Sequence, residues 1–194
     1  AVGSLNRSLK NVQGYELGSA VIKESIIRSK IKNKEGNEVI FGQVLTGGTG
    51  QNPARQASIH SGIPKEKPAY IVNQVCGSGI RSIASGFQSI KSGDSNIVIA
   101  GGQENMSLAP HAIHLRDGNK LGDTKLTDTM IKDGLWDAFH GYHMGVTAEN
   151  VAEKFQVTRE EQDKFALKSQ EKAIKAQKES KFNNEIVNFK IKSK

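Results

Sequence analysis

Cysteine, proline and aromatic residues are all scarce in this sequence. Among 194 residues there is 1 cysteine and there are 4 prolines, and aromatic residues make up 6%. A single cysteine excludes an internal disulfide framework and is compatible with a reducing compartment. Few prolines beside 20 glycines and a hydrophobic content of 36% exclude a proline-rich disordered chain and indicate a folded α/β protein.

Long apolar runs are also absent. No run approaches the roughly 18 residues that a membrane span needs. No basic segment followed by an apolar one stands at the start of the printed sequence, so nothing there has the pattern of a secretory signal. We therefore expect no membrane partner.

The positive charge has no pattern typical of a nucleic-acid site. The formal net charge is +7, but the lysines at 23–34 and 164–194 are mixed with glutamates and are not interleaved with aromatic residues. Mixtures of this kind are the ordinary surface of solvated helices. We expect no nucleic-acid partner.

Apolar patterns typical of strands and helices alternate over the first hundred residues. Short apolar runs predict strands at 38–45, 69–75 and 96–102, and helical spacing predicts helices at 15–30, from Pro53 onward, and at 77–91. The last of these helices carries one apolar stripe, which consists of Ile80, Ile83, Ala84, Phe87 and Ile90. This alternation predicts a largely parallel sheet that helices cover on both faces.

The pattern changes after the third strand. Residues 103–145 show weak periodicity and are rich in His, Asp, Gly and Met. A segment of this length is long for a plain connector, so we expect a functional or oligomer-forming role for it. Helices return at Ala148 to Phe155 and from Thr158, where Thr158 and Glu161 have the spacing of a capping box, to about 181.

The one cysteine stands where nucleophiles are found. Cys76 follows an apolar strand and precedes Gly77, Gly79 and a helix. The positive end of a helix favours a thiolate, and glycines allow a carbonyl group to approach backbone N–H groups that stabilise an oxyanion. Two other interpretations stay open, namely a small buried side chain and an anion-binding loop with an incidental cysteine, of which the glycine-rich segment 47–52 would be a second example.

A nucleophilic cysteine needs a base, and the chain has 5 histidines, namely His60, His111, His114, His140 and His143. His140 and His143 lie three positions apart in the segment "AFHGYHMG". No partner residues at metal-ligand spacing accompany them, so we expect no metal. With Met144, the pair fits the wall of an apolar pocket better.

Several of these stretches together resemble the thiolases, and most closely the biosynthetic, acetoacetyl-CoA type known as acetyl-CoA acetyltransferases. The resemblance covers nearly the whole chain and is carried by "GQNPARQAS" (50–58), "NQVCGSG" (73–79), "SGDSNIVIAGGQENMS" (92–107), "LTDTMIKDGLWDAFHGYHMGVTAENVAEKF" (126–155) and "TREEQDKFALKSQ" (158–170). It implies an acyltransferase of lipid metabolism that transfers acetyl from acetyl-CoA to Cys76 and then condenses it with a second acetyl-CoA to give acetoacetyl-CoA, or runs the reverse thiolysis.

The resemblance also assigns sites and organisation. It implies that Leu135, His143 and Met144 line the CoA and acyl pocket, that no cofactor is needed because CoA thioesters are the substrates, and that residues 107–126 form a loop for homotetramer assembly. The implied fold is a mixed sheet covered by helices on both faces, with an α/β domain at 1–106 and a loop region at 107–194. The implied location is the cytoplasm, with mitochondria as an alternative.

The chain departs from the family in extent. Thiolases have two similar halves, and the resemblance covers the first half without its first strand. The motifs that carry the activating histidine and the second cysteine belong to the other half. We therefore expect the chain to be a fragment that is inactive and aggregation-prone alone. Two alternatives are a ketoacyl-synthase-type condensing enzyme and a noncatalytic truncated paralogue that acts as an interaction module.

Overall fold

The computed structural model describes residues 3–191. These residues form two compact units: a larger unit of residues 3–134 and 189–191, and a smaller unit of residues 135–188. The predicted division into an α/β domain at 1–106 and a loop region at 107–194 is a division of a different kind, and it stays a prediction. Within the described range, no helix is long and apolar enough to cross a membrane.

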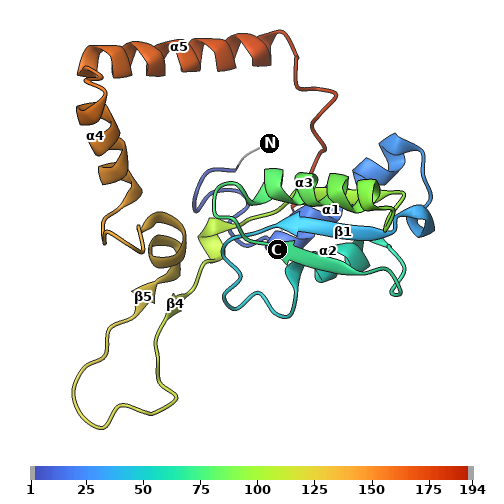
Figure 1. The fold of residues 1–194 in the computed structure, drawn as a ribbon, viewed down its shortest axis with the longest axis horizontal. Coiled ribbons are helices and arrows are strands. Elements are labelled where there is room, and N and C mark those ends of the chain that lie inside the picture. The colour runs from blue at the N-terminus through green and yellow to red at the C-terminus, as the bar shows by residue number, and fades with distance from the viewer. Residues whose placement is uncertain (1–2, 192–194) are drawn as a thin grey trace. The chain divides into compact units, whose positions relative to one another are not determined.

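A three-stranded parallel sheet forms the centre of the larger unit (Figure 1). Strand β1 (Glu38–Gly42) lies between β2 (Ala69–Val72) and β3 (Val98–Gly102). Residues Val39 to Phe41 of β1 are 0 to 2% exposed, as the continuous apolar run predicts for a parallel strand. The parallel sheet and its helices confirm the predicted α/β fold.

Helix α2 (Pro53–Ser61) packs on one face of the sheet, and α1 (Gly14–Ser29) packs against α2 and shares the core on that face. Pro53 begins α2 as predicted, and the Asn52 side chain caps it by accepting a hydrogen bond from the Arg55 N–H group. The core on this face consists of Ile22, Ile26, Val39, Phe41, Ala54, Ala57 and Ile63. Burial of these side chains is the main stabilising contribution of the larger unit.

Helix α3 (Ser78–Ser92) covers the other face. It packs against the sheet through its small residues Ser78, Ser82 and Gly86, which recur every fourth position and are all buried. The predicted apolar stripe lies on the opposite side of the helix: Ile80, Ile83 and Phe87 are 78%, 57% and 62% exposed. The helical pattern is therefore confirmed, but small residues make the contact with the sheet.

Two strands end earlier than their apolar runs suggest. The backbone N–H groups of Val44 and Leu45 donate to the Glu104 carboxylate instead of to a neighbouring strand, so β1 ends at Gly42. Strand β2 ends at Val72, because the chain then enters the turn that carries Cys76. The carboxyl ends of β1 and β2 are therefore determined by hydrogen bonds, which the apolar pattern of the sequence does not show.

The larger unit also contains the short helices η1 (Asn33–Glu35), between α1 and β1, and η2 (Met106–Leu108), after β3. After η2 the same unit extends as an arm. Its base is an antiparallel pair of two-residue strands, β4 (His111–Ala112) and β5 (Thr127–Asp128). A π-helix, η3 (Met130–Leu135), follows.

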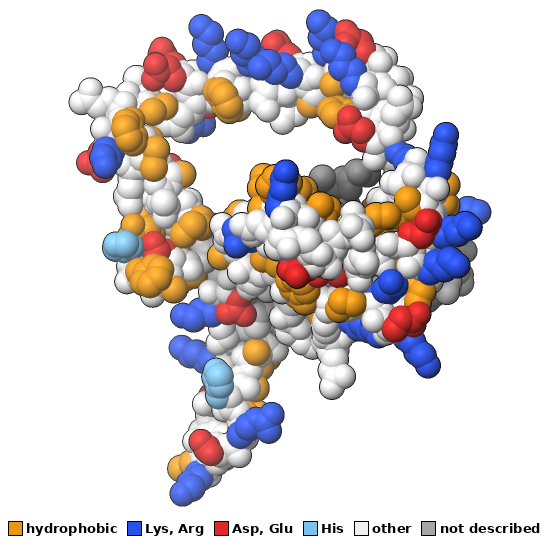
Figure 2. Space-filling view, turned by 45° about the vertical axis from the view of Figure 1, so that its right-hand side comes forward, with side chains coloured by type: hydrophobic (Ala, Val, Ile, Leu, Met, Phe, Trp, Pro, Cys, Tyr) orange, Lys and Arg blue, Asp and Glu red, His pale blue; other side chains and the backbone are white. Residues whose placement is uncertain are grey.

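The smaller unit contains α4 (Met144–Lys154) and α5 (Arg159–Lys178). Thr158 and Glu161 form the predicted capping box of α5: the Thr158 hydroxyl accepts from the Glu161 N–H group, and the Glu161 carboxylate accepts from the Thr158 N–H group. Neither helix contains a buried residue. Lysines and acidic side chains alternate along α5 (Figure 2), so the expected solvated face is present.

Candidate functional site

Cys76 lies in a short turn between β2 and α3, and its side chain is exposed. Gly77 is the N-cap of α3. The turn stands at the carboxyl ends of the parallel strands, where open α/β sheets bind their ligands. Its exposure rules out the interpretation of Cys76 as a small buried side chain.

Residues 73–78 form a closely hydrogen-bonded turn. The Gly77 N–H group donates to the Gln74 carbonyl at 3.0 Å, and the Val75 N–H group donates to Asn73 Oδ1 at 3.0 Å. Val75, directly before the cysteine, has a φ of 48°. A β-branched residue in this left-handed region is strained, and such strain is found most often at functional positions.

Two glycines of the sheet, Gly42 and Gly102, allow the start of α3 to lie close to it. A Cβ on Gly42 would lie 2.5 Å from the Ser78 carbonyl carbon and 2.6 Å from the Gly79 nitrogen. A Cβ on Gly102 would lie 3.2 Å from the Gly42 carbonyl oxygen. No side chain fits at position 42 unless the helix moves. Gly42 therefore allows the short distance between β1 and the start of α3, next to the turn that carries Cys76.

The local chemistry suits a nucleophile. The helix dipole is positive at the start of α3, which favours negative charge on a bound group there. The N–H groups of Gly77 and Ser78 already donate to the Gln74 and Val75 carbonyl groups, at 3.0 and 3.1 Å. Apart from its chain neighbours and the backbone of its own helix, a Cβ on Gly79 would meet no atom of the described residues within 4 Å. The space above Gly79 is therefore open.

The glycine-rich segment 47–52 has a structural use. Gln56 Nε2 donates to the carbonyl groups of Thr49 and Gln51, and Asn52 caps α2. These bonds hold the segment at the start of α2. Nothing in the described range marks it as a second anion site.

Leu135, His143 and Met144 lie together in the smaller unit. An antiparallel bridge pairs Trp136 with His143. In an antiparallel pair, the residue before Trp136 lies opposite the residue after His143, so Leu135 and Met144 are neighbours. His143 is the N-cap of α4, where its Nδ1 accepts from the Gly145 N–H group at 3.0 Å. A neutral imidazole in this position carries its proton on Nε2, which is then a hydrogen-bond donor.

The turn between these residues is stabilised by Asp137. Its Oδ1 accepts from the N–H groups of Phe139 and His140, and its Oδ2 lies 3.1 Å from His140 Nδ1. The backbone hydrogen bond from His140, followed by that from Phe139, lowers the pKa of the Asp137 carboxyl below its ordinary value. His140 is thus engaged in a turn, and only His143 of the pair caps a helix.

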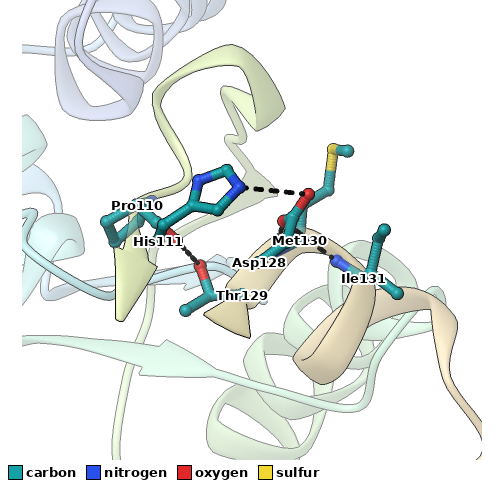
Figure 3. Close-up of polar contacts among 6 residues, drawn as sticks. All are labelled: Pro110, His111, Asp128, Thr129, Met130 and Ile131. Carbon is teal, nitrogen blue, oxygen red and sulfur yellow. Dashed lines mark hydrogen bonds and ion pairs between the residues drawn. The ribbon is translucent and has the colours of Figure 1, made fainter. Parts of the chain in front are cut away.

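The base of the arm is shown in Figure 3. His111 Nε2 lies 3.8 Å from Asp128 Oδ2, and the Thr129 hydroxyl donates to the Pro110 carbonyl. Asp128 Oδ1 also accepts from the Met130 N–H group at 2.8 Å and so begins η3. The segment between the two short strands, residues 113–126, is exposed except for the half-buried Ile113.

Of the other candidate histidines, His60 makes local contacts. His60 Nδ1 is 2.8 Å from the Gln56 carbonyl oxygen, and its ring lies 4.9 Å from that of Tyr15. Across residues 3–191, no group of three or more His, Cys, Asp or Glu side chains is close enough to hold a metal ion.

Sequence reasoning missed three residues that shape the turn and the strand ends: Asn73, Ser78 and Glu104. Asn73 was identifiable in principle, because an asparagine whose side chain accepts from the second following N–H group is a common turn signal. Glu104 and Ser78 bond to groups whose proximity only the folded chain reveals. Burial raises the pKa of the Glu104 carboxyl, although hydrogen bonds from Val44 and Leu45 oppose this effect.

Comparison with known proteins agrees with this architecture. The family described as "Thiolase, N-terminal domain" matches residues 1–194. The chain is 57% identical over its whole length to an acetyl-CoA acetyltransferase of Rhizobium meliloti and 54% identical to a cytosolic acetyl-CoA acetyltransferase of Rattus norvegicus, and covers 49% of each. It superposes on the crystal structure of the Bacillus anthracis acetyl-CoA acetyltransferase with a TM-score of 0.95 at 37% identity, covering 99% of this chain and 49% of that one.

The chain spans about half the length of the curated relatives that it matches. The match is to thiolases, which decides against the ketoacyl-synthase alternative as the family. Since the family match extends over every residue and the fold agrees with that of a solved relative, the chain belongs to the thiolase family and corresponds to its N-terminal domain.

Proposed function

We propose that the protein containing this chain is an acetyl-CoA C-acetyltransferase, with Cys76 as the residue that carries the acetyl group. The exposed thiol at the start of α3, in a strained turn beside glycines, is the observation that carries the proposal. The names of the relatives give the substrate class, because proteins 53 to 57% identical to the chain are acetyl-CoA acetyltransferases.

The proposed reaction has two covalent steps. The Cys76 thiolate attacks the thioester carbonyl of acetyl-CoA, the C–S bond to CoA breaks, and the CoA thiolate leaves and takes up a proton. The α-carbon of a second acetyl-CoA then loses a proton and attacks the acetyl-cysteine carbonyl, which releases Cys76 and gives acetoacetyl-CoA. The positive end of the α3 dipole is proposed to stabilise the negative charge that develops on the carbonyl oxygen.

Leu135, His143 and Met144 are proposed to line the CoA and acyl pocket. Their grouping around one backbone bridge supports a common role. Leucine and methionine supply apolar contact, and the Nε2–H group of His143 is a donor for an oxygen of the substrate. No further cofactor takes part in this proposal, since the CoA thioesters are themselves the substrates.

Assembly and location are further parts of the proposal. Residues 107–126 are proposed to join four copies into a homotetramer. The exposure of most of residues 113–126 and the two-stranded base of the arm support this proposal. A cytoplasmic location follows the description of the rat relative as cytosolic, with mitochondria as the alternative. Neither nucleic acid nor membrane is a proposed partner.

Substitution of the nucleophile tests the function. In the protein expressed from its complete reading frame, Cys76→Ser should reduce thiolytic cleavage of acetoacetyl-CoA by at least about 1000-fold, because a neutral hydroxyl replaces the thiolate. Incubation with acetyl-CoA followed by mass spectrometry should show an acetyl group on Cys76 in the parent and none in the variant. Parental activity in Cys76→Ser would overturn the proposal.

The 194-residue chain alone supplies the second comparison. We expect no thiolysis from it, because the resemblance places the activating histidine and the second cysteine in the other half of the family. If a genuine stop codon follows Lys194, the noncatalytic interaction module becomes the better proposal. Sequencing the reading frame through both ends decides this.

A further inference from the structure

Ser78 connects the sheet to the turn that carries Cys76. It is the first residue of α3 and is 4% exposed. Its backbone is pressed against β1, since a Cβ on Gly42 would lie 2.5 Å from the Ser78 carbonyl carbon. The position of Ser78 is therefore constrained by the sheet as well as by the turn, where its N–H group donates to the Val75 carbonyl at 3.1 Å.

The Ser78 hydroxyl holds both sides of the turn. Oγ accepts from the Gln74 N–H group at 2.9 Å and donates to the Val75 carbonyl at 2.6 Å. These two residues directly precede Cys76, which has no side-chain anchor of its own among the bonds described here. One hydroxyl group thus ties the backbone before the cysteine to the first residue of the helix after it.

The turn needs such a tie, because its conformation is unfavourable. Val75 is 49% exposed and has a φ of 48°, so no packing of its side chain accounts for the left-handed backbone. A residue in this region is strained and persists only when its surroundings enforce it. Backbone bonds from Gly77 to Gln74 and from Ser78 to Val75 contribute to this, and the paired hydrogen bonds of the Ser78 hydroxyl complete it.

We propose that Ser78 is a positioning residue for Cys76: its hydroxyl keeps Val75 in the left-handed conformation and so holds the sulfur at the positive end of α3. Without the hydroxyl, Val75 returns to an extended conformation and the sulfur leaves the helix end. This proposal rests on the proposed role of Cys76, but it concerns the reactivity of the thiol and not the substrate.

Ser82 provides a matched control. It lies one turn further along α3, is 0% exposed, and its Oγ bonds the carbonyl oxygens of Gly79 and Gly101. Ser82→Ala removes the same group from the same buried helix face without touching residues 73–77. A purely structural role for Ser78 predicts equal behaviour of the two alanine variants.

The experiment measures alkylation of Cys76 by iodoacetamide as a function of pH, in the protein expressed from its complete reading frame. Mass spectrometry of the peptide that contains Cys76 reports the rate. Ser78→Ala should slow alkylation about tenfold and move the pH profile upward, in proportion to the lost hydrogen bonds and helix-end contact. Ser82→Ala should keep the parental rate and profile, and Ser78→Thr, which retains the hydroxyl, should stay within about twofold of the parent.

A double variant keeps the proposal testable if Ser78→Ala is unstable. Glycine adopts a φ of 48° without strain, so Val75→Gly combined with Ser78→Ala should recover most of the lost alkylation rate. An unchanged rate and pH profile in Ser78→Ala, or a failure of Val75→Gly to restore them, would overturn the proposal. Failure of the proposed function is a separate result, because it appears as parental thiolysis in Cys76→Ser.

Discussion

Glu104 shows how one partly buried carboxylate replaces a strand neighbour. Its Oε2 accepts from the N–H groups of Val44 and Leu45 at 2.8 and 3.3 Å, just after β1 ends. Its Oε1 is buried and has no hydrogen-bond partner in the described structure. The residue therefore satisfies two backbone donors while it carries an unfavourably placed charge.

Substitution of Glu104 should separate these two effects. Glu104→Ala leaves two backbone donors unpaired and should lower the free energy of unfolding by about 1 to 3 kcal/mol. Glu104→Gln keeps an acceptor oxygen and should retain most of the stability at neutral pH. Chemical denaturation of the parent and both variants checks this, and equal losses in the two variants would contradict it.

The pH dependence of the same residue has a definite sign. Burial raises the pKa of Glu104 in the folded protein, so folding favours the protonated carboxyl. Its favourable contribution is fully present below the unfolded pKa and is lost as the pH rises through the raised folded pKa. Relative to Glu104→Gln, the parent should thus lose stability as the pH rises from about 4 to 7.

Helix α5 depends on its first residues more than on packing. It has no buried residue, so propensity, i,i+4 pairs such as Arg159 with Asp163 at 2.9 Å, and the capping box must maintain it. The Thr158 N–H and hydroxyl groups bond the Glu161 carboxylate and lower its pKa. The carboxylate form of Glu161 is thus the one that the cap stabilises.

Removal of this cap should loosen α5 locally. Thr158→Ala should destabilise the helix by about 1 kcal/mol, and amide hydrogen exchange should accelerate along α5 but not along α1. Thr158→Ser keeps the oxygen acceptor and should exchange like the parent.

Acid should weaken the same cap. A depressed carboxyl pKa gives stability that is present above the unfolded pKa and is lost as the pH falls through the folded value. Protection in α5, corrected for the intrinsic exchange rate, should therefore fall on acidification in the parent and much less in Glu161→Gln. Equal pH dependence in both proteins would contradict the assignment.

The elements that the sequence predicts best are those with local signals. Pro53, the capping box at Thr158 and the glycine after Cys76 all mark helix starts that the structure confirms. The length of β1 and the role of Ser78 were not predictable in this way. The length of β1 depends on hydrogen bonds between Val44 or Leu45 and Glu104, about 60 positions apart. The bonds of Ser78 to Gln74 and Val75 are local, but they depend on a turn conformation that no residue pattern marks.

At the scale of the whole chain, the surface of α3 is the feature that sequence patterns describe incompletely. Helical periodicity identifies its apolar stripe, but cannot state what the stripe faces. In the structure the stripe is exposed, and the small residues of the same helix contact the sheet. Hydrophobic side chains are accordingly visible on the surface of the larger unit (Figure 2).

This exposure predicts the solution behaviour of the 194-residue chain. Ile83 is 57% exposed, so Ile83→Gln should change its free energy of unfolding by no more than about 0.5 kcal/mol while reducing light scattering and dye binding. Ile22, which is 0% exposed, is the control: Ile22→Ala should cost about 2 to 5 kcal/mol. A loss of similar size in Ile83→Gln would show that the stripe is covered.

The central position of β1 has a consequence for synthesis of the chain. Ile40 pairs with Tyr70 on one side and with Ala100 on the other, so its two neighbours are made in succession after it. At about 5 to 20 residues per second, the ribosome needs roughly 3 to 12 s to deliver the second of them. During that interval the most buried strand of the described sheet has an open edge, and an open edge is a template for pairing with another chain.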